Sequence, residues 1–181
     1  MEKEIVTRKY DIVHIVKEIM SYVLIIIAVL LIKKFVFTPI RVNGDSMYPT
    51  LKNNDIMILN EIGYYINGLE RFNIVVVNAN GEKIIKRVIG LPGDKVEYRN
   101  NKLYINEKEI EEQFEHAETL DFSVNNDLGY EIIPDDYYFV VGDNRTNSVD
   151  SRMIGLVHKK QIIGKTNFVV YPFNRFGNIE K

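Results

Sequence analysis

Apolar residues along this chain form one long run near the N-terminus and many short runs after it. The long run, MSYVLIIIAVLLI, covers Met20–Ile32 and is by itself shorter than the roughly 20 residues that cross a bilayer core. A helix extended over residues 19–37 reaches about 28 Å at a rise of about 1.5 Å per residue. Because KKFVFTPIRV follows the run in place of the small residues of a cleavage site, the pattern predicts a retained transmembrane anchor over 19–37.

Residues 1–18 are predicted to form a cytoplasmic or membrane-surface tail. Basic residues before the run slightly outnumber those just after it, which favours a cytoplasmic N-terminus. Apolar residues in the tail also recur at a loosely helical spacing, as in helices that lie on a membrane surface. We therefore expect a single-pass protein of the cell membrane, with residues 38–181 outside the cytoplasm.

The short runs after Pro39 are separated by clusters of Gly, Asn, Pro and Asp, a pattern typical of β proteins. The segments KVEYR and KLYIN, joined at Asn100 and Asn101, predict a hairpin, because Asn tolerates the positive φ of such turns. The predicted strands are Ile40–Val42, Asp55–Asn60, Ile74–Asn78, Ile84–Ile89, Lys95–Arg99, Lys102–Asn106, Tyr137–Val141 and Asn167–Tyr171.

Acidic residues are concentrated in Glu107–Asp121. A run of like charges usually forms a solvated face, so we expect an exposed excursion from the core here. His116 has no potential metal ligands at suitable spacing and is expected at the surface.

Composition removes several classes of function. The 181 residues suffice for one domain and an appendage, and a net charge of −2 does not favour nucleic acid as a partner. Cysteine is absent, which excludes disulfides, thiolate nucleophiles and cysteine-based metal sites. No motif implies a cofactor or a metal.

Lys86 lies inside an apolar strand, in the segment KIIKRVIGLPGD. Strand side chains alternate between two faces, so Lys86 and Arg87 point in opposite directions among aliphatic residues. One interpretation is an edge strand whose charged side chains reach water. The other is a buried amine, because burial among apolar groups lowers the pKa of lysine and makes it a usable base.

A possible nucleophile follows the apolar run, in NGDSMYPTL. Gly44 permits a tight turn and Pro49 stiffens the chain, so Ser46 can present its hydroxyl on a rigid loop. An ordinary serine turn would have the same composition. Serine needs a base to attack a carbonyl, and none of the histidines lies in a suitable segment, whereas Lys86 meets the requirement.

A third polar segment, VVGDNRTNSVDSR, follows the strand-like YYFVV. Asp143 and Arg152 have suitable chemistry for an ion pair, and the Ser148 hydroxyl is short enough to orient an amine. Taken alone, the segment would equally suit a solvated turn.

Together these segments resemble the bacterial type I signal peptidases, or leader peptidases, in the short form typical of Gram-positive bacteria. These enzymes are membrane-anchored serine proteases. The resemblance rests on the apolar run, GDSMYPTL, RFNIVVV, IIKRVIGLPGD and GDNRTNSVDSR, in the order of the family. It implies a mostly β fold with a coiled β-sheet catalytic core and a small β appendage, a minimal inserted subdomain at 97–133.

The resemblance also implies the roles of individual residues. Ser46 would be the nucleophile of a Ser-Lys dyad and Lys86 its general base. Ser148 would steady the amine of Lys86. Asp143, Asp150 and Arg152 would hold the surrounding loop. The implied substrates are secretory preproteins, cut after small residues to remove their signal peptides, beside the lipid bilayer.

Two further positions bear on this implied site. Gly44 stands where some members carry a serine that binds the oxyanion, so backbone N–H groups, including that of Ser46, would take over here. The apolar residues around Met47 and Tyr48 are expected to contact the bilayer or the apolar part of the substrate.

Two other functions fit parts of the pattern. A Ser-Lys self-cleaving repressor of the LexA type would need an N-terminal DNA-binding domain, where this chain has its apolar run. A non-catalytic anchored module could bind exported peptides in the same groove. The sequence does not define an oligomeric state.

Overall fold

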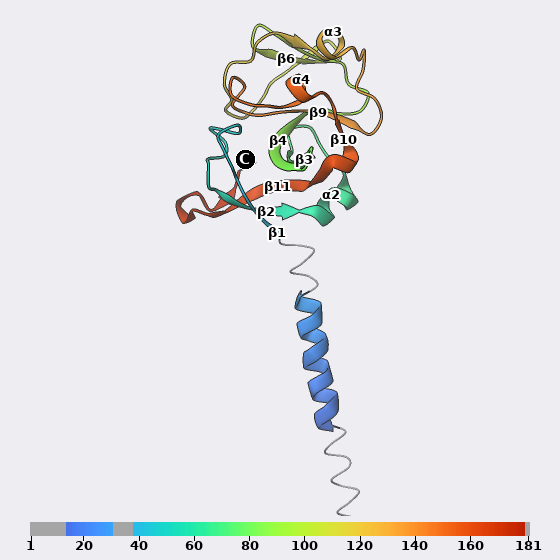
Figure 1. The fold of residues 1–181 in the computed structure, drawn as a ribbon, viewed down its shortest axis with the longest axis vertical. Helices are drawn as coiled ribbons and strands as arrows, with labels where there is room; N and C mark the ends of the chain where they lie inside the picture. The colour runs from blue at the N-terminus through green and yellow to red at the C-terminus, as the bar shows by residue number, and fades with distance from the viewer. Residues whose placement is uncertain (1–13, 31–37, 180–181) are drawn as a thin grey trace, which may run out of the picture. The chain divides into compact units, whose positions relative to one another are not determined.

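The structure of the protein is a computed structural model, which describes residues 14–30 and 38–179. The chain forms two compact units, Met1–Thr38 and Pro39–Lys181, drawn in Figure 1.

The first unit contains a helix over residues 14–30, the long helix drawn in blue in Figure 1. Its apolar side chains are exposed, with Leu24 and Leu30 about as accessible as the others. No helix within 14–30 or 38–179 combines the length and apolar character needed to span a membrane. The last part of the predicted anchor, residues 31–37, lies outside the described residues, so the anchor stays a prediction.

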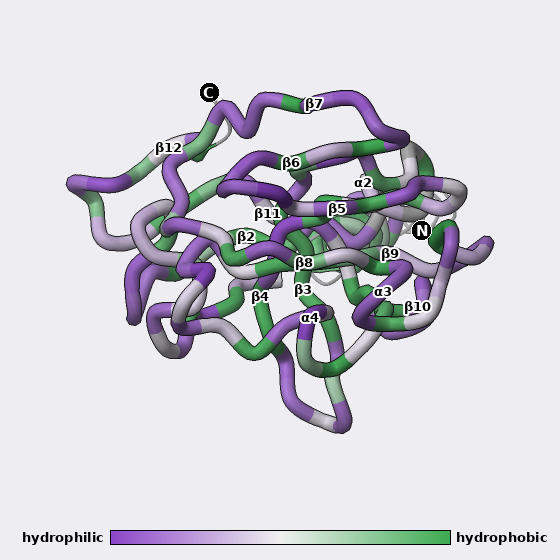
Figure 2. Tube along the Cα trace, turned by 90° about the horizontal axis from the view of Figure 1, so that it is seen from above, coloured by the Kyte–Doolittle hydropathy of each residue, from purple (hydrophilic) through white to green (hydrophobic). Residues whose placement is uncertain are grey.

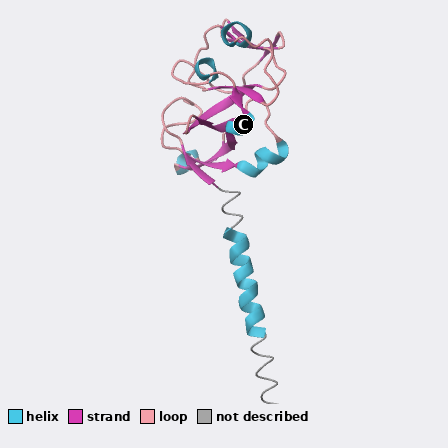
Figure 3. Cartoon of the chain, turned by 45° about the vertical axis from the view of Figure 1, so that its right-hand side comes forward, coloured by secondary structure: helices cyan, strands magenta, loops and turns pink. Residues whose placement is uncertain are grey.

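The second unit is mostly β, as the sequence predicts, with short helices between strands (Figure 3). The strands are β1 (Thr38–Arg41), β2 (Ile56–Asn60), β3 (Ile74–Ala79), β4 (Glu82–Gly90), β5 (Val96–Arg99), β6 (Lys102–Ile105), β7 (Lys108–Ile110), β8 (Phe122–Ser123), β9 (Tyr137–Val141), β10 (Val157–His158), β11 (Ile162–Tyr171) and β12 (Gly177–Asn178). The helices and 3-10 turns are α2 (Glu61–Asn67), α3 (Val124–Leu128), α4 (Ser151–Ile154), η1 (Lys159–Gln161) and η2 (Phe173–Arg175).

The larger sheet has the strand order β1-β2-β11-β3-β4-β9-β10, with β12 paired to β11. Strand β4 lies inside this sheet, antiparallel to β3 on one side and to β9 on the other. The interpretation of Ile84–Ile89 as an edge strand is therefore wrong. In Figure 2 the hydrophobic colour gathers on central strands such as β3 and β4, and the hydrophilic colour on peripheral connections.

The smaller sheet has the order β7-β6-β5-β8 and falls within the segment for which the sequence predicts an appendage. Its β5–β6 hairpin turns at Asn100 and Asn101, both with positive φ, as predicted. A continuous apolar cluster joins the two sheets, with Val96 and Leu103 from the smaller sheet packed with Ile89 and Phe139 from the larger one. The smaller sheet therefore shares a core with the larger one.

The apolar pattern did not predict the short strands β7, β8, β10 and β12, which have two or three residues each. Two longer features also differ from the prediction. Strand β11 begins at Ile162, earlier than predicted, because inward positions of its first half are Gly164 and Thr166, both buried yet not apolar. Helix α2 follows β2 directly, and its signal is the cap residue Asn60, whose side chain accepts a hydrogen bond from the Gly63 N–H.

The expectation that Glu107–Asp121 forms a solvated face is wrong for part of the segment. The Glu112 side chain is only 4% exposed, and His116 is 15% exposed and contacts it. Thr119 is buried as well. A run of charges in sequence does not reveal which member turns inward, because the buried partner comes from a distant part of the chain.

Gly90, at the end of β4, lies where the two sheets pack together, so we expect a larger residue there to destabilise the fold. A Cβ atom at Gly90 would lie 2.4 Å from Ile133 Cδ1 and 2.7 Å from Val96 Cγ2. Gly90→Ala should therefore lower the free energy of unfolding by about 1–3 kcal/mol, the cost of overpacking a core. Gly164→Ala, whose Cβ would meet its nearest atoms at 3.1 Å, should cost less. Thermal denaturation measures both, and a Gly90→Ala protein as stable as the parent would contradict this packing.

Candidate active site

Ser46 lies on a short loop that is hydrogen-bonded at both ends. Gly44 has a φ of 83°, which is strained for residues with a side chain, and its N–H donates to Asn53 Oδ1 at 3.1 Å. After Ser46, the Leu51 N–H donates to the Met47 carbonyl at 2.9 Å, and both side chains are buried. The loop thus holds a half-buried Ser46 between fixed neighbours.

Lys86 reaches this loop from the middle of β4. Its side chain is 2% exposed, and its Nζ donates to Ser46 Oγ at 2.8 Å and to the Ile85 carbonyl at 3.0 Å. The two side chains come from positions 40 residues apart in sequence. The fold thereby places an amine within hydrogen-bond distance of a serine hydroxyl.

Burial lowers the pKa of Lys86 from 10.5 to about 8, although Asp150 and Asp143 act to raise it. At pH 7 most of the amine is still protonated with such a pKa, and the neutral form of Lys86 predominates only above about pH 8. A lysine with this pKa can accept a proton near neutral pH, which an exposed lysine cannot.

The segment 142–152 lies against both residues. Asp143 forms a buried, two-point ion pair with Arg87, with distances of 2.9 and 2.6 Å. Asp150 pairs with Arg152 at 2.8 Å, caps α4, and accepts a hydrogen bond from the Gly142 N–H at 3.0 Å. The ion pair expected between Asp143 and Arg152 is therefore wrong, because each residue has a different partner.

Burial by itself would raise the pKa of Asp150, but the hydrogen bonds from Arg152 and from the Gly142 N–H outweigh it. They hold the pKa of this carboxyl below its usual value. Asp150 therefore stays ionised near Lys86, with its charge directed mainly at Arg152.

Ser148 lies close to Ser46 without bonding to Lys86. A Cβ atom at Gly142 would fall 2.2 Å from Ser148 Oγ and 2.4 Å from the Ser46 carbonyl oxygen, so glycine is required between them. The Ser148 hydroxyl is buried and forms no hydrogen bond of normal geometry within the described part of the chain, although it lies near enough to the Asp150 carboxyl to help lower the pKa of that group. The expected contact with the Lys86 amine is not formed here, and the role of Ser148 stays a prediction.

Asn144 is a site residue that the sequence analysis did not single out. Its N–H donates to the Ser46 carbonyl at 3.1 Å, and its Nδ2 donates to the Asp45 carbonyl at 3.0 Å. Its position in a polar loop was the only local signal in the sequence. Its hydrogen-bond partners are backbone carbonyls of a segment far away in the chain, which no local pattern indicates.

A cleft of about 620 Å³ lies over this arrangement. Its lining residues include Ser46, Lys86 and Ser148, and the full set is Asn43, Gly44, Asp45, Ser46, Ile84, Lys86, Thr146, Asn147, Ser148, Val149 and Met153. A small pocket of about 50 Å³ adjoins Ser46 and is lined in part by Val42, Met47 and Ile85.

Of the two contacts expected of Met47, contact with a bilayer does not fit the structure, because the side chain is 1% exposed and packs in the core. It also borders the small pocket beside Ser46, so contact with a substrate stays a prediction. Tyr48, in contrast, is exposed.

A second cavity, of about 520 Å³, lies on the Arg87 side and is lined in part by Pro49, Arg71, Phe72 and Phe114. Neither Ser46 nor Lys86 lines it. The Thr50 hydroxyl in its lining accepts a hydrogen bond from Arg87, whose guanidinium cannot act as a base.

The arrangement in this cleft can support attack on a carbonyl. It joins a hydroxyl to an amine of lowered pKa at 2.8 Å, which is the pairing of an activated serine. The Ser46 N–H has no hydrogen-bond partner within residues 38–179 and is available to bind an oxyanion. Gly44 offers no side-chain donor.

Comparison with known proteins shows the family of the chain. The family model for "Signal peptidase, peptidase S26" matches residues 15–171. The chain is 44% identical to "Signal peptidase I S" of Bacillus subtilis (strain 168), with 96% of this chain and 97% of that protein covered. It is 40% identical to "Signal peptidase IB" of Staphylococcus aureus (strain COL), with 88% and 93% covered.

A solved structure is also similar. The crystal structure of a signal peptidase I from Enterococcus faecalis V583 is 35% identical, with a TM-score of 0.50 over 54% of this chain and 95% of that chain. The extent of these matches shows that the chain belongs to the signal peptidase family, peptidase S26.

Proposed function

We propose that this protein is a membrane-anchored serine endopeptidase that removes signal peptides from exported preproteins with a Ser46–Lys86 dyad. The observation that carries the proposal is the 2.8 Å contact between Ser46 Oγ and Lys86 Nζ, in a lysine that is only 2% exposed. The membership of the peptidase S26 family supports it.

In the acylation step, the neutral Lys86 amine accepts the proton of the Ser46 hydroxyl while Ser46 Oγ bonds to the substrate carbonyl carbon. The carbonyl oxygen becomes an oxyanion that backbone N–H groups, including that of Ser46, stabilise. Lys86 then passes the proton to the leaving amine of the mature protein. An acyl-enzyme on Ser46 remains.

In the second step, Lys86 accepts a proton from a water molecule, whose oxygen attacks the acyl carbon. The bond from this carbon to Ser46 Oγ then breaks, Lys86 returns the proton to Ser46 Oγ, and the signal peptide leaves with a new carboxyl group. The same amine thus acts as base and acid in both halves. Arginine could not replace it, because a guanidinium does not lose its proton in proteins.

The small pocket beside Ser46 supports a preference for small side chains before the cut. Its volume of about 50 Å³ is small beside the cleft of about 620 Å³. The buried Met47 helps to close it. A short side chain such as that of alanine suits this space better than a leucine or phenylalanine side chain.

The helix over residues 14–30 supports an anchor in the lipid bilayer. Its large apolar side chains are exposed within the described part of the chain, and its 17 residues at about 1.5 Å each extend about 26 Å. A bilayer core of about 30 Å would remove these side chains from water. In this arrangement the N-terminus is cytoplasmic and the catalytic unit is outside the cytoplasm.

Cleavage of a synthetic preprotein, with products identified by mass spectrometry, tests the proposed reaction. The parent should cut after a small residue, with kcat/KM rising as pH increases through about 8, because Lys86 must lose its proton to act. Ser46→Ala and Lys86→Met should fall to background. Peptide binding without cleavage by the parent would instead indicate a binding module, and appreciable cleavage by Lys86→Met would remove Lys86 from the dyad.

The lowered pKa also predicts a stability cost. Below about pH 8 the amine is protonated in both folded and unfolded chains, and the fall in pKa from 10.5 to about 8 corresponds to a cost of roughly 3 kcal/mol. Between these values only the unfolded chain binds the proton, so stability rises with pH. Above 10.5 the cost is gone.

Lys86→Met should therefore be more stable than the parent at pH 7, and its advantage should shrink between about pH 8 and 10.5. Lys86→Arg should be the less stable of the two variants, because its cation remains among aliphatic side chains. Urea denaturation at several pH values measures both. A constant difference between Lys86→Met and the parent across this range would show that desolvation of the amine is not its source.

The orientation can be tested with external protease on intact cells or spheroplasts that carry an epitope at the C-terminal end. The epitope should be digested, because the catalytic unit lies outside the cytoplasm. Protection of the epitope in intact cells, together with digestion after lysis, would reverse the proposed topology.

A further inference from the structure

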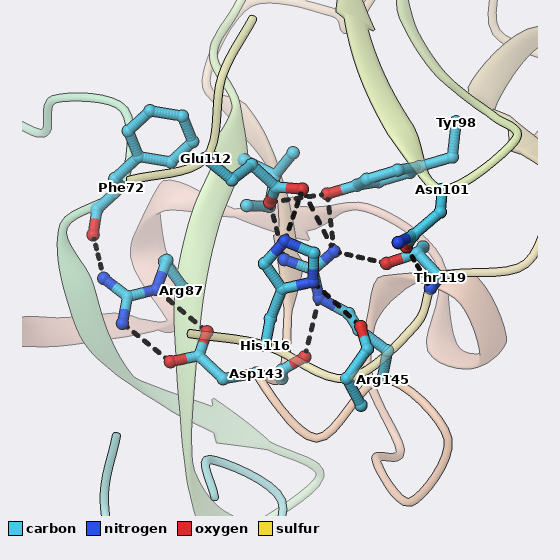
Figure 4. A network of polar contacts seen from close by, with 12 residues as sticks. Phe72, Arg87, Tyr98, Asn101, Glu112, His116, Thr119, Asp143 and Arg145 are labelled. Atoms are coloured by element: carbon cyan, nitrogen blue, oxygen red, sulfur yellow. Dashed lines mark hydrogen bonds and ion pairs between the residues drawn. The ribbon is translucent and has the colours of Figure 1, made fainter. Parts of the chain in front are cut away.

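Three consecutive residues connect the proposed dyad to the rest of the fold. Asp143 holds Arg87, the neighbour of Lys86, through two hydrogen bonds. Asn144 holds the backbone carbonyls of Ser46 and Asp45. Arg145, the third residue, turns away from the dyad and toward the smaller sheet, where the network of Figure 4 surrounds it.

The guanidinium of Arg145 is held on every side. Its Nη2 donates to Glu112 Oε1 and its Nη1 to Thr119 Oγ1, both at 2.6 Å. Nη1 also lies 3.2 Å from the Tyr98 hydroxyl. Nε donates back to the Gly142 carbonyl at 3.1 Å, which ties the guanidinium to its own loop.

Glu112 and Thr119 lie in a segment, residues 111–121, that has no regular secondary structure. It is nevertheless joined to the loop at a further point, because the Ala117 N–H donates to the Asp143 carbonyl at 2.9 Å. His116 Nε2 lies 3.4 Å from Glu112 Oε2. An irregular segment between β7 and β8 therefore contacts both Asp143 and Arg145.

The Arg145–Glu112 pair is buried, with side chains 1% and 4% exposed. Removing two charges from water costs several kcal/mol, so such a pair is weak support for a role in stability alone. Its geometry, in contrast, is fixed by several short hydrogen bonds. A fixed Arg145 leaves the backbone of residues 142–145 little freedom. Because the Asn144 N–H donates to the Ser46 carbonyl, the backbone of Ser46 is restricted as well.

We propose that Glu112 and Thr119 are positioning residues for the reaction at Ser46. They hold Arg145, Arg145 fixes the backbone of residues 142–145, and Asn144 fixes the Ser46 backbone so that its hydroxyl stays beside Lys86. The inference rests on the proposed function of Ser46 and Lys86. It gives the smaller sheet and the acidic segment a part in catalysis although neither lines the cleft.

The test uses the full-length chain in detergent, with a synthetic preprotein and a serine-acylating probe. Thr119→Val removes only the hydroxyl acceptor, and Glu112→Gln removes the charge. Each should lower kcat by roughly 10- to 100-fold with little change in KM, the size of effect expected for a misplacement of about 1 Å. Thr119→Ser keeps the hydroxyl and should restore the parent kcat.

The probe separates positioning from loss of folded protein. In Thr119→Val and Glu112→Gln the fraction of molecules labelled at Ser46 should equal that of the parent, while the rate constant of labelling falls. The matched control is Glu109→Gln, which neutralises an exposed glutamate of β7, paired with Lys102, and it should behave as the parent.

Parent-like rate constants in both variants would overturn the inference. So would a lower labelled fraction with an unchanged rate constant, which would indicate a purely structural role. Failure of the proposed function is distinct from either result, since the parent itself would then neither cleave the preprotein nor label at Ser46.

Discussion

The burial of one lysine amine beside one serine hydroxyl is the constraint on which this structure depends. A buried amine loses its proton more readily only while desolvation outweighs the carboxylates around it. Asp143 and Asp150 both lie close enough to raise the pKa of Lys86. Each is paired with a guanidinium, from Arg87 and Arg152 respectively, so its charge is largely compensated. The two ion pairs therefore allow acidic residues near the amine without returning its pKa to the ordinary value.

Strand β4 meets this constraint because its side chains alternate. Lys86 points toward the loop of Ser46, while the next residue, Arg87, points the other way and holds Asp143. The same strand thus supplies the proposed base and the anchor of the loop that borders it. Its interior place in the sheet, between β3 and β9, provides the burial. Close packing then leaves no room for a side chain at Gly142, which lies between Ser148 and the Ser46 backbone.

The smaller sheet changes how the acidic segment is understood. The core of the smaller sheet is continuous with that of the larger sheet. Glu112, in the acidic segment that follows β7, pairs with the guanidinium of Arg145 in the loop beside Ser46. Most charges of the segment are exposed, as composition suggests. The exception is Glu112, whose partner Arg145 is buried. Burial makes this ion pair specific, because either charge left unpaired there would be costly.

The sequence by itself determined the eight longer strands in outline, the hairpin at Asn100 and Asn101, and Ser46 and Lys86 as candidate partners, since alternation, turn residues and the need of serine for a base are local or chemical properties. The short strands β7, β8, β10 and β12 were not predicted. It did not determine the interior position of β4, the partners of Asp143 and Arg152, or the inward turn of Glu112. Contacts between residues far apart in sequence decide these features, and no local pattern records them. The start of β11 was hidden for a related reason, because Gly164 and Thr166 are buried by neighbouring strands and not by their own hydrophobicity. Tertiary structure alone brought the amine, the hydroxyl and their supporting loop together, since only packing can remove a lysine from water.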